Sequence, residues 1–482
     1  MGGTHTDKQP WHRSGVVLAC LALAAGCAGE PIVLDGRAVS MRYDPNRVAG
    51  LPVTDGPNGP RTTPPSAVGR VVNTDDGDID RLALLAVVDI EDFWAQNYRT
   101  PLPGEFSPVS ELVSIDPGSS GPRMCGAQPS EFEFNAAYCR TADVIVWDRI
   151  GLFPTAGKFF GDMSINGILA HEYGHALQQK ARLGDDDTPL LISEQQADCF
   201  AGVYLRWVAE GNSPRFAINT TDGLDKVLAG AIAIRDRPPD FNPFGLLSVD
   251  ATHGTALDRV SAIQQGFDLG TASCTRITAA EISARRGDIP ASLFDPAAEQ
   301  SDMAITEQSV SDLIDDLNGI FAPTEPPTLR FGVSCGSGPT AYCTDTNTVE
   351  VDLDRLADIG TPASESQQVL LQGDNSAISV VTSRYMQAVQ QQRAVSLNGD
   401  IAAMRTACLT AVAQSKMSDP ALTGDGLVLG AGDLDEAVSG LLTNGIAASD
   451  ARGQAVPSGF TRILAFRLGL GGDTERCFNQ FR

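Results

Sequence analysis

The sequence predicts an α+β fold in which one domain occurs twice. Apolar residues recur at helical spacing over residues 78–98, whereas residues 143–149 alternate as in a strand. Sequence blocks of the first half also return in the same order in the second half. These observations place one copy at residues 71–285 and the other at 298–482, with the linker at 286–297.

The N-terminus resembles an export signal. Lys8, His12 and Arg13 precede the apolar run "GVVLACLALAAGC", which is too short to cross a bilayer and is typical of a signal peptide. Its end is similar to a bacterial lipobox, so residues 1–27 are expected to be a signal peptide with Cys27 lipidated. The protein is expected to lie on the outer face of the cell membrane, where a lipid anchor would hold it. The alternative is an ordinary cleaved signal and a secreted protein.

The segment after the signal is rich in proline and glycine. Residues 28–70 contain "LPVTDGPNGPRTTPPSAVG", which predicts an extended tether.

The charge of the chain limits its partners. A formal net charge of -25 over 482 residues argues against a nucleic-acid partner, because phosphates would be repelled. Apolar content of 42% and charged content of 20% are those of a globular protein.

The repetition is visible in three pairs of segments. "CGAQPSEFEFNAAYCRTADVIVWDR" at 125–149 is echoed by "CGSGPTAYCTDTNTVEVDLDR" at 335–355. "ADCFAGVYL" returns as "TACLTAVAQ", and "RVSAIQQGFDLGTASC" returns as "RILAFRLGLGGDTERC". The sequence therefore predicts two copies of one domain.

The cysteines follow the repeat. Outside the export signal, eight cysteines fall at matching places in the two halves, which predicts disulfides in an oxidising compartment. A thiolate metal site made by Cys125, Cys139 and Cys199 is the alternative. The predicted pairs are Cys125 with Cys139, Cys199 with Cys274, Cys335 with Cys343, and Cys408 with Cys477.

Two helices are expected to carry the chemistry. "INGILAHEYGHALQQKAR" at 165–182 has helical periodicity without an internal proline. "SEQQADCFAGVYLRWV" at 193–208 predicts a second helix, with Ser193 as its N-cap.

The first helix carries two histidines four residues apart. On one helical face, His171 and His175 can present two imidazoles to one metal ion, which suits tetrahedral zinc with a position left for water. Glu172 is placed to take the proton of that water. The alternative is a pair of buried, hydrogen-bonded histidines with no metal.

A catalytic zinc ion needs a third protein ligand. Gln178 and Ala181 exclude the longer His-x-x-Gly-x-x-His continuation of the motif. On the next helix, Glu194 can serve as the third ligand, and Asp198, one turn later, can hydrogen-bond a liganding imidazole.

These segments, together with "THGTALDRVSAIQQGF", resemble the neutral zinc metallopeptidase family, a group within the gluzincins. The resemblance covers roughly residues 120–275 and implies a zincin-like domain. It also implies zinc held by His171, His175 and Glu194, with Glu172 as the base.

Two further residues belong to the last of these segments. By analogy with thermolysin-like enzymes, His253 is expected either to donate to the oxyanion of the reaction or to serve the structure alone. Arg259 is expected to be structural, because Arg462 keeps its place in the other half. An extended substrate is expected to lie along residues 143–149, taken as an edge strand.

The hypothesis is an exported, lipid-anchored zinc metallopeptidase that hydrolyses protein or peptide substrates with a zinc-bound water. One alternative is a non-enzymatic exported lipoprotein that keeps the fold as a binding or scaffold module. Another is an inhibitor or scaffold in which the C-terminal copy is the working part.

The C-terminal copy lacks the metal residues. Ser383, Arg384 and Gln387 stand at the places of the His-Glu-x-x-His residues, and Ala403 and Ala407 replace the two carboxylates of the next helix. The sequence predicts a zinc-free pseudo-peptidase domain, retained for packing, substrate docking or a protein partner.

Overall fold

The computed structural model describes residues 1–3, 32–34, 37–39, 41–99, 101–184, 187–233, 253–294, 303–361, 373–424 and 426–482. The chain divides into two compact units, Met1–Met41 and Arg42–Arg482. The first contains a hairpin in which β1 (Ile32–Leu34) pairs antiparallel with β2 (Arg37–Val39). Residues 4–27 of the predicted signal peptide, which include Cys27, lie outside the described residues. Among the helices described, none is both long and apolar enough to span a bilayer.

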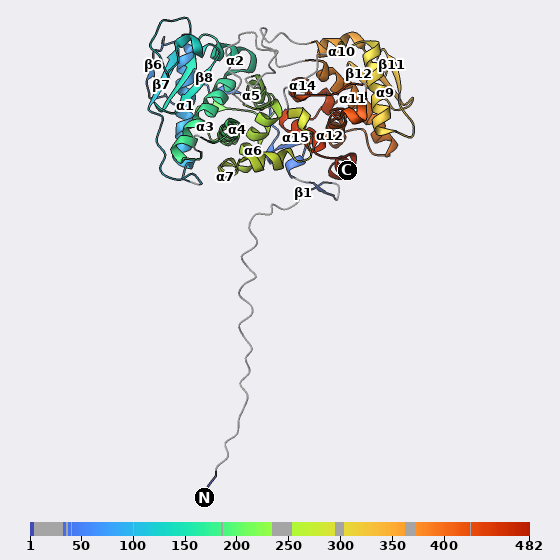
Figure 1. Cartoon of the computed structure of the whole chain (residues 1–482), viewed down its shortest axis with the longest axis horizontal. Coiled ribbons are helices and arrows are strands. Elements are labelled where there is room, and N and C mark those ends of the chain that lie inside the picture. The colour runs from blue at the N-terminus through green and yellow to red at the C-terminus, as the bar shows by residue number, and fades with distance from the viewer. Residues whose placement is uncertain are drawn as a thin grey trace. The chain divides into compact units, whose positions relative to one another are not determined.

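The second unit begins with short elements and a helix-rich N-terminal half (Figure 1). Its strands are β3 (Arg47–Val48), β4 (Leu51–Pro52), β5 (Gly59–Pro60), β6 (Val71–Val72), β7 (Glu111–Ile115), β8 (Ala136–Cys139), β9 (Val144–Asp148) and β10 (Phe216–Ala217). Its helices are α1 (Asp78–Asn97), α2 (Leu152–Phe160), α3 (Asp162–Ala181), α4 (Leu190–Ala209), α5 (Asp222–Ala233), α6 (Ala256–Leu269), α7 (Thr271–Cys274) and α8 (Ala279–Arg286). Short 3-10 turns are η1 (Met41–Tyr43), η2 (Pro129–Phe132) and η4 (Ala291–Phe294).

The main sheet of this half has the order β6-β7-β9-β8. β7 runs parallel to β6 and β9, whereas β8 is antiparallel to β9 and forms the edge. Residues 144–148 are buried throughout, as expected for a strand with a neighbour on each side. The expectation of an edge strand at 143–149 is therefore wrong, because the alternation of one strand does not reveal which strands flank it.

Helices α3 and α4 pack directly against each other. A side chain on Gly174 would place its Cβ 2.7 Å from the Cα of Ala197, so glycine permits this close approach of the two backbones. Helix α4 begins at Leu190 with Pro189 as its N-cap. The predicted N-cap, Ser193, instead lies in the first turn and donates from its hydroxyl to Gln178 over 3.0 Å.

The predicted tether of residues 28–70 is wrong for its described second part. From Arg42 onwards these residues belong to the second unit, where β5 pairs with β10 and Val48 is fully buried. The Thr54 backbone N–H donates to Thr220 over 2.8 Å. Proline and glycine here shape turns that pack on the domain, so composition alone did not separate a tether from an ordered loop.

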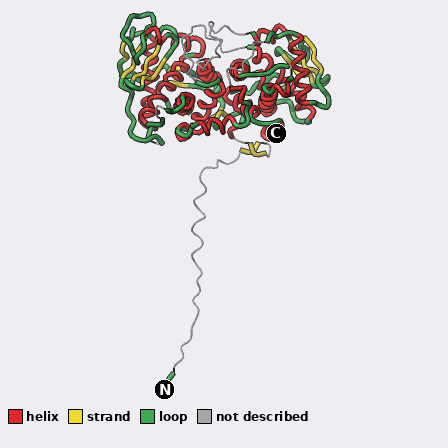
Figure 2. The backbone as a smooth tube through the Cα atoms, in the orientation of Figure 1, coloured by secondary structure: helices red, strands yellow, loops and turns green. Residues whose placement is uncertain are grey.

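The C-terminal half follows with strands β11 (Thr328–Phe331), β12 (Thr340–Cys343) and β13 (Thr348–Val351). Figure 2 shows the helices that make up most of the unit in red. Those of this half are α9 (Glu307–Phe321), α10 (Leu353–Gly360), α11 (Asp374–Gln392), α12 (Asp400–Met417), α13 (Pro420–Thr423), α14 (Ala431–Thr443), α15 (Gly459–Leu470) and α16 (Thr474–Gln480), with the turn η7 (Ile446–Ala448).

The strands of the two halves correspond in order and direction. β11 is parallel to β13, and β12 is antiparallel to it, as β7 and β8 are to β9. In both halves the second helix after these strands packs on the next long helix, α3 on α4 and α11 on α12. These correspondences support the predicted duplication, which stays a prediction.

The structure joins the eight cysteines in four disulfides, with Cα–Cα distances of 5.4 to 5.8 Å. The pairs are those expected from the repeat: Cys125 with Cys139, Cys199 with Cys274, Cys335 with Cys343, and Cys408 with Cys477.

A partly buried glutamate links α1 to the helix of the His-Glu-x-x-His motif. The hydroxyl of Tyr173 on α3 donates to Glu91 on α1 over 3.2 Å. Burial raises the pKa of Glu91 from its ordinary 4.5 to about 7, against the hydrogen bonds it accepts.

Glu91→Gln is expected to stabilise the protein at pH 8 and to have little effect near pH 4. A carboxyl whose pKa is raised on folding contributes stability below its unfolded pKa, and that contribution is lost as the pH rises towards 7. The gain in the free energy of unfolding of Glu91→Gln over the wild type should be up to about 3 kcal/mol larger at pH 8 than at pH 4, because each pKa unit corresponds to about 1.36 kcal/mol. Urea unfolding of both proteins at both pH values measures it, and equal pH profiles would contradict it.

Candidate metal centre

Three predicted ligands meet between α3 and α4. His171 and His175 lie one turn apart on α3, and Glu194 is the fifth residue of α4. The Nε2 atom of His171 lies 3.1 Å from Oε2 of Glu194, and that of His175 lies 3.5 Å from Oε1. Ligands about 2.1 Å from a tetrahedral zinc ion are about 3.4 Å apart, so this donor set fits zinc. The three donor atoms all lie within 4.8 Å of one another.

The other ring nitrogen of each histidine is already engaged. Nδ1 of His171 lies 2.7 Å from Oδ1 of Asp198, and Nδ1 of His175 lies 3.1 Å from Oε1 of Gln178. These partners fix both rings so that Nε2 of each faces Glu194. The predicted role of Asp198 agrees with this geometry, whereas the part of Gln178 was not predicted.

Asp198 is in turn held by an arginine from α6. Arg259 is 1% exposed and donates to both oxygens of Asp198, over 2.9 Å from Nε and 2.7 Å from Nη2. The expectation that Arg259 serves only the structure missed this link. Arg259 and Asp198 are 61 residues apart in the sequence and meet only because α6 packs against α4, a contact that the sequence pattern does not show.

Glu172 lies beside the cluster and is also buried. Its Oε2 atom accepts a hydrogen bond of 2.8 Å from the backbone N–H of Tyr138 on β8. Burial raises the pKa of Glu172, although the nearby His171 and His175 act in the opposite direction. A carboxylate with a raised pKa is well suited to accept and return a proton near neutral pH.

The charges of the ligands are strongly coupled. Burial opposes the charged form of His171, but Asp198 and Glu194 outweigh it and raise the pKa of His171 to about 10. Burial likewise opposes ionisation of Glu194, but its bonds to His171 and His175 hold the pKa of Glu194 below its usual range. A metal ion in this position must therefore displace protons from the imidazoles.

His253 lies at the rim of the cluster. Its Nε2 atom is 3.7 Å from Oε2 of Glu194, and its side chain is 35% exposed. The structure thus brings all three histidines of the chain after residue 27 to one place. Its partial exposure leaves His253 able to meet a bound molecule.

The fold and this site define a class of protein. A mixed α/β domain with two histidines one helical turn apart, an adjacent glutamate and a third ligand from the next helix is the arrangement of a zincin-like domain. The chain belongs to the family described as "Putative neutral zinc metallopeptidase", which matches residues 13–277. The family resemblance inferred from the sequence is therefore confirmed.

Two curated relatives support this assignment. "Uncharacterized protein YpfJ" of Escherichia coli strain K12 is 33% identical over 283 residues, covering 55% of this chain and 86% of the relative. The protein of the same name from Escherichia coli O6:H1 matches with the same identity and coverage. No solved structure matches the chain. The family match ends at residue 277 and so does not include the C-terminal half.

The corresponding positions of the C-terminal half hold a different arrangement. Arg384, at the place of Glu172, donates to the Ser449 hydroxyl over 2.9 Å, and Gln387 donates to the Ser449 carbonyl over 3.1 Å. Ser383 donates to the Val380 carbonyl within its own helix over 2.6 Å. Ser449, directly after η7, thus accepts hydrogen bonds from two of the side chains that stand at the places of the metal residues, and the zinc-free domain stays a prediction.

Proposed function

We propose that the protein is a zinc-dependent peptidase that hydrolyses peptide bonds. The observation that carries the proposal is the convergence of His171, His175 and Glu194, with Glu172 buried beside them. The donor set of two imidazoles and one carboxylate is that of catalytic zinc sites that leave one position open.

The residues have distinct tasks in this reaction. Zinc, when bound, supplies a Lewis acid that polarises the scissile carbonyl and lowers the pKa of water. Glu172 accepts a proton from the attacking water and delivers it to the leaving amine, while the Tyr138 N–H fixes the orientation of its carboxylate. His253 is placed at the rim, where it can donate to the oxygen on which negative charge develops.

The edge strand β8 is the proposed docking site for substrate. The backbone N–H of Tyr138 points away from β9 and towards Glu172, so the unpaired side of β8 lies beside the site. In an antiparallel pair, the N–H and C=O groups of one residue point the same way, so an extended peptide can pair with this edge beside Glu172.

We also propose export and a lipid anchor on Cys27, on the strength of the N-terminal sequence. The four disulfides are in keeping with an oxidising compartment. The mass of the mature N-terminus should show an acylated Cys27; an unmodified cysteine there would contradict the anchor.

Metal analysis of the purified full-length chain should find one zinc ion per molecule. His171→Ala should remove it, because two protein ligands hold zinc much less tightly than three. Two zinc ions per chain would contradict the predicted zinc-free C-terminal domain. A folded wild-type protein without zinc would favour the alternative, a non-enzymatic binding or scaffold module.

A further inference from the structure

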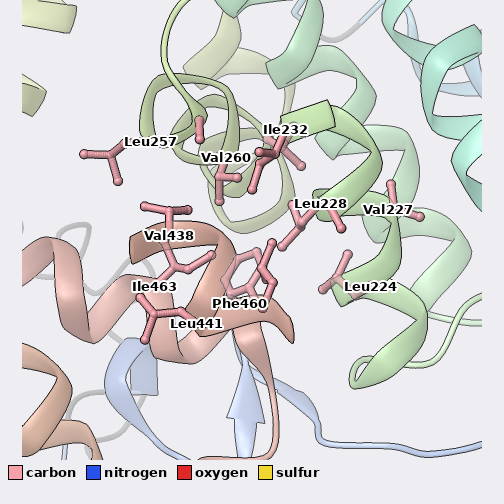
Figure 3. Packing of buried hydrophobic residues seen from close by; sticks show 14 of the residues in the cluster. Leu224, Val227, Leu228, Ile232, Leu257, Val260, Val438, Leu441, Phe460 and Ile463 are labelled. Carbon is pink, nitrogen blue, oxygen red and sulfur yellow. The ribbon is translucent and has the colours of Figure 1, made fainter. Parts of the chain in front are cut away.

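The two halves of the second unit meet through an apolar contact made by four helices. Helices α5 and α6 of the first half pack against α14 and α15 of the second. Figure 3 shows side chains of both halves pointing into one cluster, where Phe460 and Ile463 face Leu228 and Val260. The ring centroids of Phe267 and Phe460 are 5.3 Å apart. This contact makes α6 part of both the metal centre and the interface.

Each half also caps a helix of the other. The carboxylate of Asp435 on α14 accepts a hydrogen bond of 2.8 Å from the backbone N–H of Ala256, the first residue of α6. The carboxylate of Asp225 on α5 accepts one of 2.9 Å from Gly459, the first residue of α15.

These two bonds are counterparts. "GLDKVLAGAI" at 223–232 aligns with "DLDEAVSGLL" at 433–442, which sets Asp225 opposite Asp435. A carboxylate at a helix N-terminus accepts from an otherwise unpaired N–H and is favoured by the helix dipole. The interface therefore carries one reciprocal pair of caps.

Only one of the two capped helices contributes a side chain that contacts the metal centre. Helix α6 begins three residues after His253. Arg259 lies about one turn into the helix, where it holds Asp198 and, through it, His171. On α15 the counterpart Arg462 donates instead to the carbonyls of Leu441 and Val456.

We propose that the C-terminal half positions the zinc site, and that Asp435 is the positioning residue it supplies. Asp435 fixes the first turn of α6, α6 places Arg259 against Asp198, and Asp198 orients His171. This inference rests on the proposed zinc site and gives the non-catalytic half a task within it.

The test compares Asp435→Ala with its counterpart Asp225→Ala in the full-length chain. Each change removes one cap from the same interface, and Asp225→Ala also removes the ion pair with Arg462, 4.0 Å away, so it should lower stability at least as much as Asp435→Ala. Zinc affinity, measured by competition with a chromogenic chelator, should fall about 10-fold in Asp435→Ala, the size of effect expected for a residue that acts on a site through a chain of packed and hydrogen-bonded side chains. In Asp225→Ala it should stay within about twofold of the wild type, because α15 does not reach the site.

Amide hydrogen exchange gives a readout independent of activity. Asp435→Ala should speed exchange at the start of α6, and Asp225→Ala at the start of α15. Should Asp435→Ala fail to fold, Asp435→Asn is expected to show the same loss of zinc affinity to a smaller degree. Equal zinc affinities in the variants at Asp435 and Asp225 would overturn the inference while leaving the proposed function intact. A wild-type protein that binds no zinc would overturn both.

Discussion

Glu172→Gln is expected to lower the rate of peptide hydrolysis by about 10²- to 10⁴-fold, the usual contribution of a general acid–base residue. Glutamine keeps the volume of the buried side chain, and its amide oxygen can still accept the Tyr138 N–H. The glutamine side chain cannot take up a proton near neutral pH. Burial raises the pKa of Glu172, which favours proton uptake and release by the glutamate. The metal ligands are unchanged, so zinc should stay bound.

The measurement is the rate constant for cleavage of an unstructured protein substrate, with zinc content determined on the same preparation. Glu111→Gln, an exposed change at the start of β7, is the matched control and should retain wild-type activity. Hydrolysis by Glu172→Gln at the rate of this control would show that Glu172 is not the base.

Asp198→Ala is expected to weaken both folding and zinc binding. Removal of the Asp198 carboxylate leaves the buried Arg259 without its partner. The free energy of unfolding should therefore fall by about 4 kcal/mol, the usual cost of breaking a buried ion pair from one side. The substitution also frees the Nδ1 side of His171, which should lower zinc affinity by about 10- to 100-fold.

A second substitution separates the two effects. In the double variant Asp198→Ala, Arg259→Met, no buried charge is left unpaired, so the free energy of unfolding should recover towards the wild-type value. Zinc affinity should stay low, because His171 still lacks its partner. Recovery of zinc affinity along with stability would contradict the orienting role of Asp198.

The sequence predicted the metal site because its chemistry is local. His171 and His175 are tied by helical spacing, and Glu194 follows on the next amphipathic segment, so three ligands could be assigned without knowing how the helices pack. The disulfide pairs followed from matched places in the two halves. Helix α1 and strand β9 were predictable from periodicity alone.

The features that the sequence did not predict depend on contacts between distant segments. Whether 144–148 is an edge strand depends on the pairing of β8 and β7 with it. The bond between Arg259 and Asp198 spans 61 residues, and that between Ala256 and Asp435 spans 179. A polar residue on a helix gives no sign of such a partner until the helices are packed.

Zinc titration of the metal-free protein tests the central claim most directly. The full-length chain is stripped with a chelator and returned to zinc in steps while cleavage of an unstructured protein substrate is followed. Activity should be absent without metal, rise in proportion to added zinc and level off at one equivalent per chain. Cleavage that persists without zinc, or a chain that binds one equivalent and cleaves nothing, would contradict the assignment of this site as a zinc peptidase centre.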